Sequence, residues 1–177
     1  TDEDPRLEDQ YTGAILPPVT RTNFQSALTN TPLSWDWGVR TLDAGNQLQS
    51  VYQKLGLEQA RLDPACDGYI YWTIVDVGSP SAQGLLNQFW KSKASESNYF
   101  AQFNGPATIL ATFSPGTRIL TSGQTLSVQW WLSTFEPGPI TGQSLNWSLK
   151  NGTNALASGQ VSSISATAGD VKSIGTN

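Results

Sequence analysis

Histidine and methionine are absent from this sequence of 177 residues, and cysteine and charge are scarce. Without histidine the chain cannot build a Ser-His-Asp or Cys-His catalytic centre from its own residues, and it lacks the ligand of nearly every zinc site. The single cysteine, Cys66, excludes an internal disulfide framework and any cluster of cysteine ligands. We therefore expect no metal and no cofactor, and we interpret Cys66 as an inert thiol at a turn.

Long apolar runs and basic blocks are missing as well. No stretch approaches the roughly 18 apolar residues of a membrane span, so we expect no membrane partner. The net charge of −4 disfavours a nucleic-acid partner. The start TDEDPRLEDQ has no signal-peptide pattern, and with no methionine it predicts a mature segment or an internal fragment. Low charge with many Ser, Thr, Asn and Gln residues indicates a secreted or periplasmic protein.

What is present suffices for a hydrophobic core, since 10% of the residues are aromatic and seven are tryptophan. The pattern changes near Asn104-Gly105-Pro106, a cluster typical of a turn. Before it, helical and strand patterns are mixed. After it, short strands and turns follow one another. We therefore predict two domains, residues 1–104 and residues 105–177.

The first region predicts helices around one buried strand. Apolar residues recur at helical spacing over 44–62, after a possible capping residue, Asp43. The run 69–75 is almost continuously apolar and predicts a strand covered on both faces, as in a parallel sheet. Helices are also predicted over 23–28 and 95–103. The order helix, buried strand, loop, helix is that of one α/β barrel unit.

The second region predicts an all-β domain. Asn151-Gly152 is a hairpin signal, and Leu132 and Leu145 lie on the apolar faces of alternating runs. An immunoglobulin-like sandwich needs about seven strands and roughly 100 residues, so we expect a truncated sandwich with an unpaired edge. The predicted strands are residues 108–113, 117–120, 124–135, 144–150 and 155–164.

One set of residues resembles the end of the catalytic barrel in glycoside hydrolase family 2. The segment 68–76 is similar to the family's eighth barrel strand, which reads Gly, apolar residues, Trp, three residues and Asp; here these are Gly68, Trp72 and Asp76. Gly84 and Lys93 match family positions that follow this strand. An Asn-Gly-Pro turn and an immunoglobulin-like domain come next in the family. The resemblance implies the last unit of a (β/α)8 TIM barrel followed by an immunoglobulin-like β-sandwich, here incomplete.

The resemblance also implies a function. Retaining β-glycosidases use two carboxylates about 5 to 5.5 Å apart, one as acid/base and one as nucleophile. The family places both on earlier barrel strands, so this chain is expected to hold no catalytic residue, and the nucleophile is expected within roughly ten residues before Thr1. The chain is then the C-terminal segment of a β-galactosidase-like hydrolase, and its partners are a carbohydrate substrate and the rest of its parent polypeptide.

Two residues of this strand are candidates for the sugar site. By resemblance, the ring of Trp72 packs beside the reacting sugar; the alternative is a core tryptophan of a barrel strand. Asp76 binds a sugar hydroxyl or anchors the neighbouring loop. Glucuronidases of the family carry Asn-x-Lys where this chain has Ser81 and Gln83, so a neutral sugar is favoured over a glucuronide.

Three further tryptophans have two interpretations each. Trp35 and Trp37 flank a carboxylate and form an outer sugar subsite, or they pin a long loop. Trp131 is a carbohydrate-binding platform, or it packs one domain on the other. As platforms, the three support a rival function, a non-catalytic carbohydrate-binding or adhesion module. A structural fragment of another α/β protein is the second rival. A doubly buried strand over 69–75 argues against a binding module.

Overall fold

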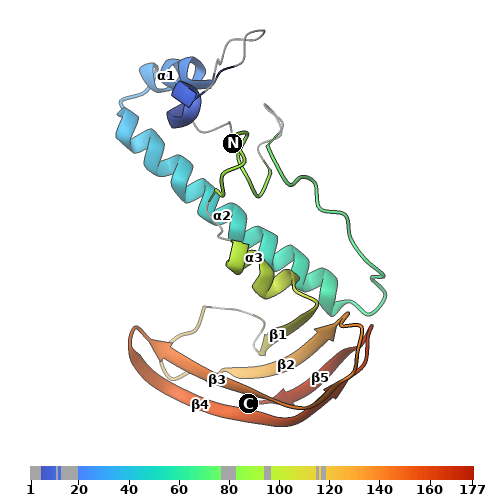
Figure 1. Cartoon of the computed structure of the whole chain (residues 1–177). Coiled ribbons are helices and arrows are strands. Elements are labelled where there is room, and N and C mark those ends of the chain that lie inside the picture. Colours follow the sequence, from blue (N-terminus) through green and yellow to red (C-terminus); the bar gives the residue numbers. More distant parts are fainter. Residues whose placement is uncertain are drawn as a thin grey trace. The chain divides into compact units, whose positions relative to one another are not determined.

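A computed structural model describes two compact units, which we treat separately. Unit 1 comprises Thr1–Leu55 and Tyr69–Phe100, and unit 2 comprises Gly56–Gly68 and Ala101–Asn177. Helices and antiparallel strands are both present, as predicted (Figure 1). No helix in the described ranges is long and apolar enough to cross a membrane. The described residues are 5–10, 12, 20–76, 83–93, 97–114, 116 and 119–177.

Among the described residues, four helical elements precede the strands. The 3-10 helix η1 spans Pro5–Gln10, α1 spans Thr20–Thr29, α2 spans Trp35–Leu62 and α3 spans Ser97–Asn104. The helices predicted from residues 23, 44 and 95 are confirmed as parts of α1, α2 and α3. The domain boundary predicted between residues 104 and 105 stays a prediction.

Helix α2 begins earlier than predicted, and the reason lies in its cap. The side chain of Ser34 accepts a hydrogen bond from the backbone N–H of Trp37 at 3.2 Å, which satisfies one of the free donors of the first turn. Asp36 adds a negative charge to that turn, where the helix dipole favours it. Asp43 therefore lies inside the helix, and the prediction that it caps the helix is wrong.

The prediction of a doubly buried strand over 69–75 is also wrong. Only Val75 forms a β-bridge, a parallel one to Leu86. Ile70 is 95% exposed and Trp72 is 67% exposed. The segment lacks a neighbouring strand among the described residues, and an apolar run without a partner for its backbone forms no sheet.

The described residues of unit 2 form two antiparallel sheets. Strands β1, β2 and β5 form one sheet in the order β1-β2-β5, and β3 pairs with β4 in the other (Figure 1). Four predicted strands are confirmed as β1 to β4, whereas Ile119 and Leu120 lie outside any strand and β5 was not predicted. The strand bounds are Ala107–Ser114 for β1, Ser127–Thr134 for β2, Ile140–Asn151 for β3, Asn154–Ala166 for β4 and Val171–Thr176 for β5.

A small core joins the two sheets of unit 2. Leu132 of β2 packs with Ile164 and Ala166 of β4, and partly buried Leu145 packs against them, as predicted for Leu132 and Leu145. The predicted hairpin joins β3 to β4, and its Gly152 has a φ of 60°, which a glycine adopts without strain.

Arg61 connects three backbone segments of unit 2. Its guanidinium donates to the carbonyl of Gly105 at 2.8 Å, of Pro106 at 3.4 Å and of Ser133 at 3.2 Å. It also lies over the Phe135 ring, 5.3 Å from the ring centroid. A planar group with five donors can serve such divergent acceptors, so Arg61 holds the end of α2 to the start of β1 and to β2.

Candidate functional site

A buried polar cluster of unit 1 is centred on Asp76, directly after the extended segment. The Asp76 carboxylate accepts a hydrogen bond from the backbone N–H of Gly84 at 2.7 Å. It also pairs with the Lys93 ammonium at 3.3 Å, and both side chains are at least nine-tenths buried. A buried carboxylate is stable only with such partners, so the three residues form one interdependent group, which we call the Asp76 cluster.

Backbone bonds bring the two ends of this loop together. The Asp76 N–H donates to the Leu86 carbonyl at 3.0 Å, and the Leu86 N–H donates to the Ile74 carbonyl at 2.9 Å. The two segments approach so closely at Gly84 that a Cβ atom there would lie 2.5 Å from the Asp76 nitrogen. Only glycine fits this position without displacing backbone.

Helix α2 holds the same loop through two glutamines one turn apart. Gln49 donates to the carbonyls of Gln83 at 2.8 Å and Gly84 at 3.1 Å. Gln53 donates to the Tyr71 hydroxyl, which in turn donates to the Gln83 carbonyl at 2.9 Å. Burial raises the pKa of Tyr71, although the hydrogen bonds from Gln53 and Gln49 oppose this effect.

A tight turn around Asn87 follows the cluster. Asn87 Oδ1 accepts hydrogen bonds from the backbone N–H groups of Phe89 at 2.9 Å and Lys91 at 3.0 Å. Trp90 within this turn has a φ of 61° and an exposed side chain. Because its oxygen is used twice by the turn, the orientation of the Asn87 amide is defined.

Asp76 and Asn87 both line a cavity of about 600 Å³ in unit 1. Its other walls come from η1 and from the first half of α2. The carboxylates on the wall are both paired, Asp76 with Lys93 and Asp43 with Arg6 at 2.8 Å. The remaining lining residues are Leu7, Leu42, Asn46, Gln47, Lys91 and Ser92.

This arrangement is suited to holding a loop and binding a polar ligand. An acid/base pair needs two carboxyl groups free to exchange protons, and among the described lining residues both carboxylates, Asp76 and Asp43, are already paired. The prediction that catalytic residues lie outside this chain stays a prediction.

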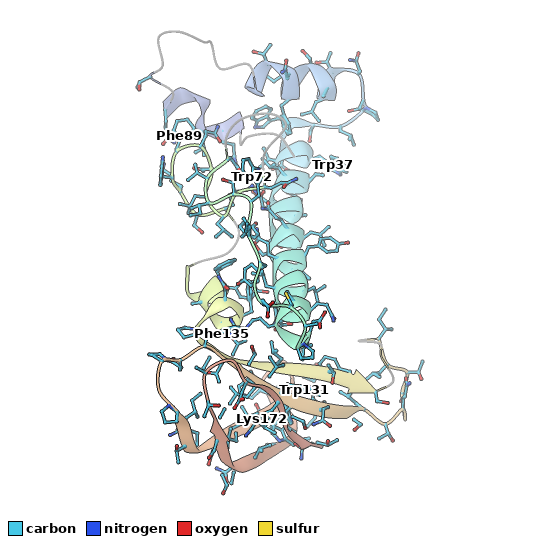
Figure 2. All side chains as sticks on the ribbon, turned by 90° about the vertical axis from the view of Figure 1, so that its right-hand side faces the viewer. Trp37, Trp72, Phe89, Trp131, Phe135 and Lys172 are labelled. Atoms are coloured by element: carbon cyan, nitrogen blue, oxygen red, sulfur yellow. The ribbon has the colours of Figure 1, made fainter. Side chains whose placement is uncertain are left out.

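The four predicted site residues do not meet in one place. Asp76 lines the cavity, whereas Trp72, Trp35 and Trp37 are absent from its walls. Trp72 and Trp37 project on different sides of α2 in Figure 2. Trp35 packs edge-on against Phe24 of α1, with 5.1 Å between the ring centroids.

Two other residues singled out from the sequence are Trp131 and Ser81. The structure describes the surroundings of Trp131 but not those of Ser81. The Trp131 indole N–H donates to Thr112 Oγ1 at 3.1 Å, across the pair of strands β1 and β2. Ser81, on which the choice of a neutral sugar partly rests, lies outside the described residues.

Sequence reasoning missed the α2 wall of the cavity. Asp43, Asn46 and Gln47 are spaced three and four residues apart, so they share one helical face. That polar stripe beside the apolar stripe of the same helix was the available signal. No sequence pattern pointed to Arg6, because its partner Asp43 is 37 residues away along the chain.

The chain matches no protein-family model, and a comparison with curated proteins finds no match.

Proposed function

We propose that this chain is the C-terminal part of a retaining β-glycosidase similar to glycoside hydrolase family 2, acting on a neutral sugar. The observation that carries this proposal is the Asp76 cluster. Three residues of the resemblance, Asp76, Gly84 and Lys93, are joined by direct contacts although they lie eight and 17 positions apart. A chance similarity gives no reason for matched residues to depend on one another.

In this proposal, Trp72 supplies an apolar wall for the reacting sugar. Its ring is largely exposed, and it lies four residues before the anchored Asp76. An aromatic face suits the C–H surface of a pyranose and excludes water from it. Asp76 then acts as the anchor of the loop beside the sugar, because its carboxylate is already occupied by Gly84 and Lys93.

The finer fold belongs to the same proposal. Helix α2, the segment 69–76 and α3 form the last unit of a (β/α)8 TIM barrel within residues 1–104. The exposed Ile70 side chain is then covered by barrel strands from the rest of the polypeptide, whereas the exposed Trp72 ring is left to face the sugar. Residues 105–177 form an immunoglobulin-like sandwich, for which the two sheets around Leu132 are the support.

The parent protein, in this proposal, is secreted or periplasmic and needs no cofactor. Both catalytic carboxylates come from the remainder of the polypeptide, and the substrate is an O-linked β-glycoside of galactose, glucose or mannose. The bonds around Asp76 provide the rigid support that a sugar-binding surface requires.

A hydrolysis assay with two polypeptides tests the proposal. The 177-residue chain alone should hydrolyse none of the three nitrophenyl β-glycosides. The same chain extended by the barrel segment encoded before Thr1 should hydrolyse one of them, and Trp72→Ala should lower its kcat/KM. Hydrolysis by the 177-residue chain, or an upstream sequence without a strand ending in Glu, would contradict it.

A carbohydrate-binding module is the second candidate, and one observation favours it. The doubly buried strand that argued against it is absent, and Trp72 and Trp37 are exposed. Exposed tryptophans form the platforms of such modules. This candidate predicts that the isolated chain is retained on insoluble cellulose, mannan or galactan, and that Trp72→Ala and Trp37→Ala each weaken retention.

A further inference from the structure

The cavity of unit 1 has features of a second ligand site, apart from Trp72. Its volume of about 600 Å³ is within the range of small-molecule sites, about 300 to 1,000 Å³. Trp72 does not line it. A sugar unit bound in the cavity would therefore be a different unit from the one that we place beside Trp72.

Asn87 is the buried group that points to a ligand. The residue is only 6% exposed and lines the cavity. Its Oδ1 accepts from Phe89 and Lys91, so its Nδ2 must carry the donors. Among the described residues Nδ2 has no hydrogen-bond partner. Because Nδ2 keeps contact with the solvent of the cavity, its donors are open to water or to an acceptor atom of a ligand.

Two amides on α2 add to this donor. Asn46 and Gln47 line the cavity, and neither side chain bonds to another described residue. Each amide offers both a donor and an acceptor, which matches a hydroxyl group that is also both. Leu7 and Leu42 add a small apolar surface to the same walls. A ligand with several hydroxyls and a C–H face satisfies all of these groups.

The charges on the walls do not call for a charged ligand. Arg6 is paired with Asp43 at 2.8 Å and Lys93 with Asp76 at 3.3 Å. Lys91 Nζ donates to Gln10 Oε1 at 2.7 Å. Each cation on the wall thus already has a partner within unit 1.

We propose that this cavity binds a neutral pyranose unit through the amides of Asn87, Asn46 and Gln47. The choice of a sugar among hydroxyl-bearing ligands rests on the proposed function. The pyranose is a further unit of the same substrate or a free sugar, and both present the same hydroxyls.

The test is a titration of the uniformly ¹⁵N-labelled 177-residue chain with methyl β-galactoside, methyl β-glucoside and methyl β-mannoside. We expect one of them to shift the side-chain NH₂ resonances of Asn87, Asn46 and Gln47. No shift of these amides with any of the three sugars, or shifts confined to the Trp72 indole, would overturn the proposal. Tighter binding of glucuronate than of the neutral sugars would overturn it as well.

Variants on the exposed part of the wall keep the turn around Asn87 intact. Asn46→Ala and Gln47→Ala should each raise the Kd about fivefold, the effect of one lost hydrogen bond, and alanine preserves the helix. Gln59→Ala is the matched control, because Gln59 is exposed on α2 outside the cavity. An unchanged Kd in both cavity variants contradicts the proposal.

A β-linked disaccharide separates the two sources of the pyranose. Joint shifts of the cavity amides and the Trp72 indole identify a further unit of one substrate, whereas shifts of the amides alone identify a free sugar. Both support the cavity as a pyranose site. If the amides shift but the extended polypeptide hydrolyses no β-glycoside, the proposed function fails and the cavity stands. If the extended polypeptide is active but the amides do not shift, the proposed function holds and the cavity proposal fails.

Discussion

The strand region of unit 2 is held by continuous ladders of backbone hydrogen bonds, whereas the loop region of unit 1 has a few backbone bonds and depends largely on side chains. Strand β2 pairs along its length with β1, and one apolar core around Leu132 joins the two sheets. In unit 1, the loop after Ile74 depends on an ion pair, two glutamines and a tyrosine hydroxyl. Removal of one side chain should therefore affect the loop locally and far more than it affects the sheets.

Loss of the buried cation is expected to have the largest effect. Lys93→Ala leaves the Asp76 carboxylate buried without its partner, which costs about 3–5 kcal/mol of stability. Hydrogen exchange should accelerate at the amides of Gly84 and Leu86 and stay slow in β1 and β2. Arg40→Ala is the control, because it breaks an exposed pair with Asp36 on α2, where about 0–1 kcal/mol is expected. Equal effects of the two variants would refute this difference.

In unit 2, Arg61 is a side chain that joins three backbone segments, and its replacement tests the other half of the comparison. Arg61→Lys keeps the charge but cannot serve the carbonyls of Gly105, Pro106 and Ser133 together. We expect a loss of about 2–4 kcal/mol in urea denaturation, since hydrogen bonds from a charged donor contribute about 1.5–3 kcal/mol each. Arg40→Lys, the same change on an exposed face, should leave the midpoint unchanged. A stable Arg61→Lys chain would show that the sheets suffice without this group.

A single methyl group should disturb the hairpin of unit 2. A Cβ at Gly159 would lie 2.7 Å from the Trp147 ring, which packs across the β3–β4 pair. Gly159→Ala is expected to cost about 1–3 kcal/mol through overpacking, measured as a lower thermal midpoint. Gly138→Ala meets no atom within 4 Å and should change nothing. Identical thermal midpoints for the two variants would mean that the Trp147 ring moves aside without a cost in stability.

The smallest effect concerns pH. The pKa of Tyr71 is raised by burial, so the folded state retains the phenolic proton more strongly than the unfolded chain. The resulting stability is complete below the ordinary pKa of 10.0 and is lost as the pH rises through the raised value. Tyr71→Phe should cost about 1 kcal/mol at neutral pH through its lost hydrogen bond to Gln83. Its denaturation midpoint should then fall less steeply than that of the parent chain above about pH 10, and a parallel decline would contradict the assignment.

Local patterns predicted the three α-helices and most strands, because their partners lie nearby or their periodicity is strong, whereas the 3-10 helix η1 was not predicted. The hairpin at Gly152 follows from two residues, and α3 follows from its aromatic spacing. Strand β5 was missed because Val171 and Ile174 are three residues apart and do not alternate. The strand predicted over 69–75 is absent for another reason. A strand needs neighbouring strands to pair with, and a local apolar pattern does not reveal whether they are present.

The candidate site shows the same limit. Asp76, Gly84 and Lys93 could be selected from the sequence by resemblance, but their mutual contacts could not. The pairing of Arg6 with Asp43 joins two exposed charges far apart in the chain, and no periodicity signals it. The polar face of α2 could have been found, since Asp43 and Gln47 are one helical turn apart.

We propose that the Asp76 cluster supports the sugar wall of a retaining β-glycosidase. The most direct measurement is the NMR spectrum of the first sugar released from a nitrophenyl β-glycoside by the polypeptide extended before Thr1. We expect the β-anomer to appear first and Lys93→Ala to abolish the reaction. Release of the α-anomer first, or no hydrolysis by a correctly folded extended polypeptide, would contradict it.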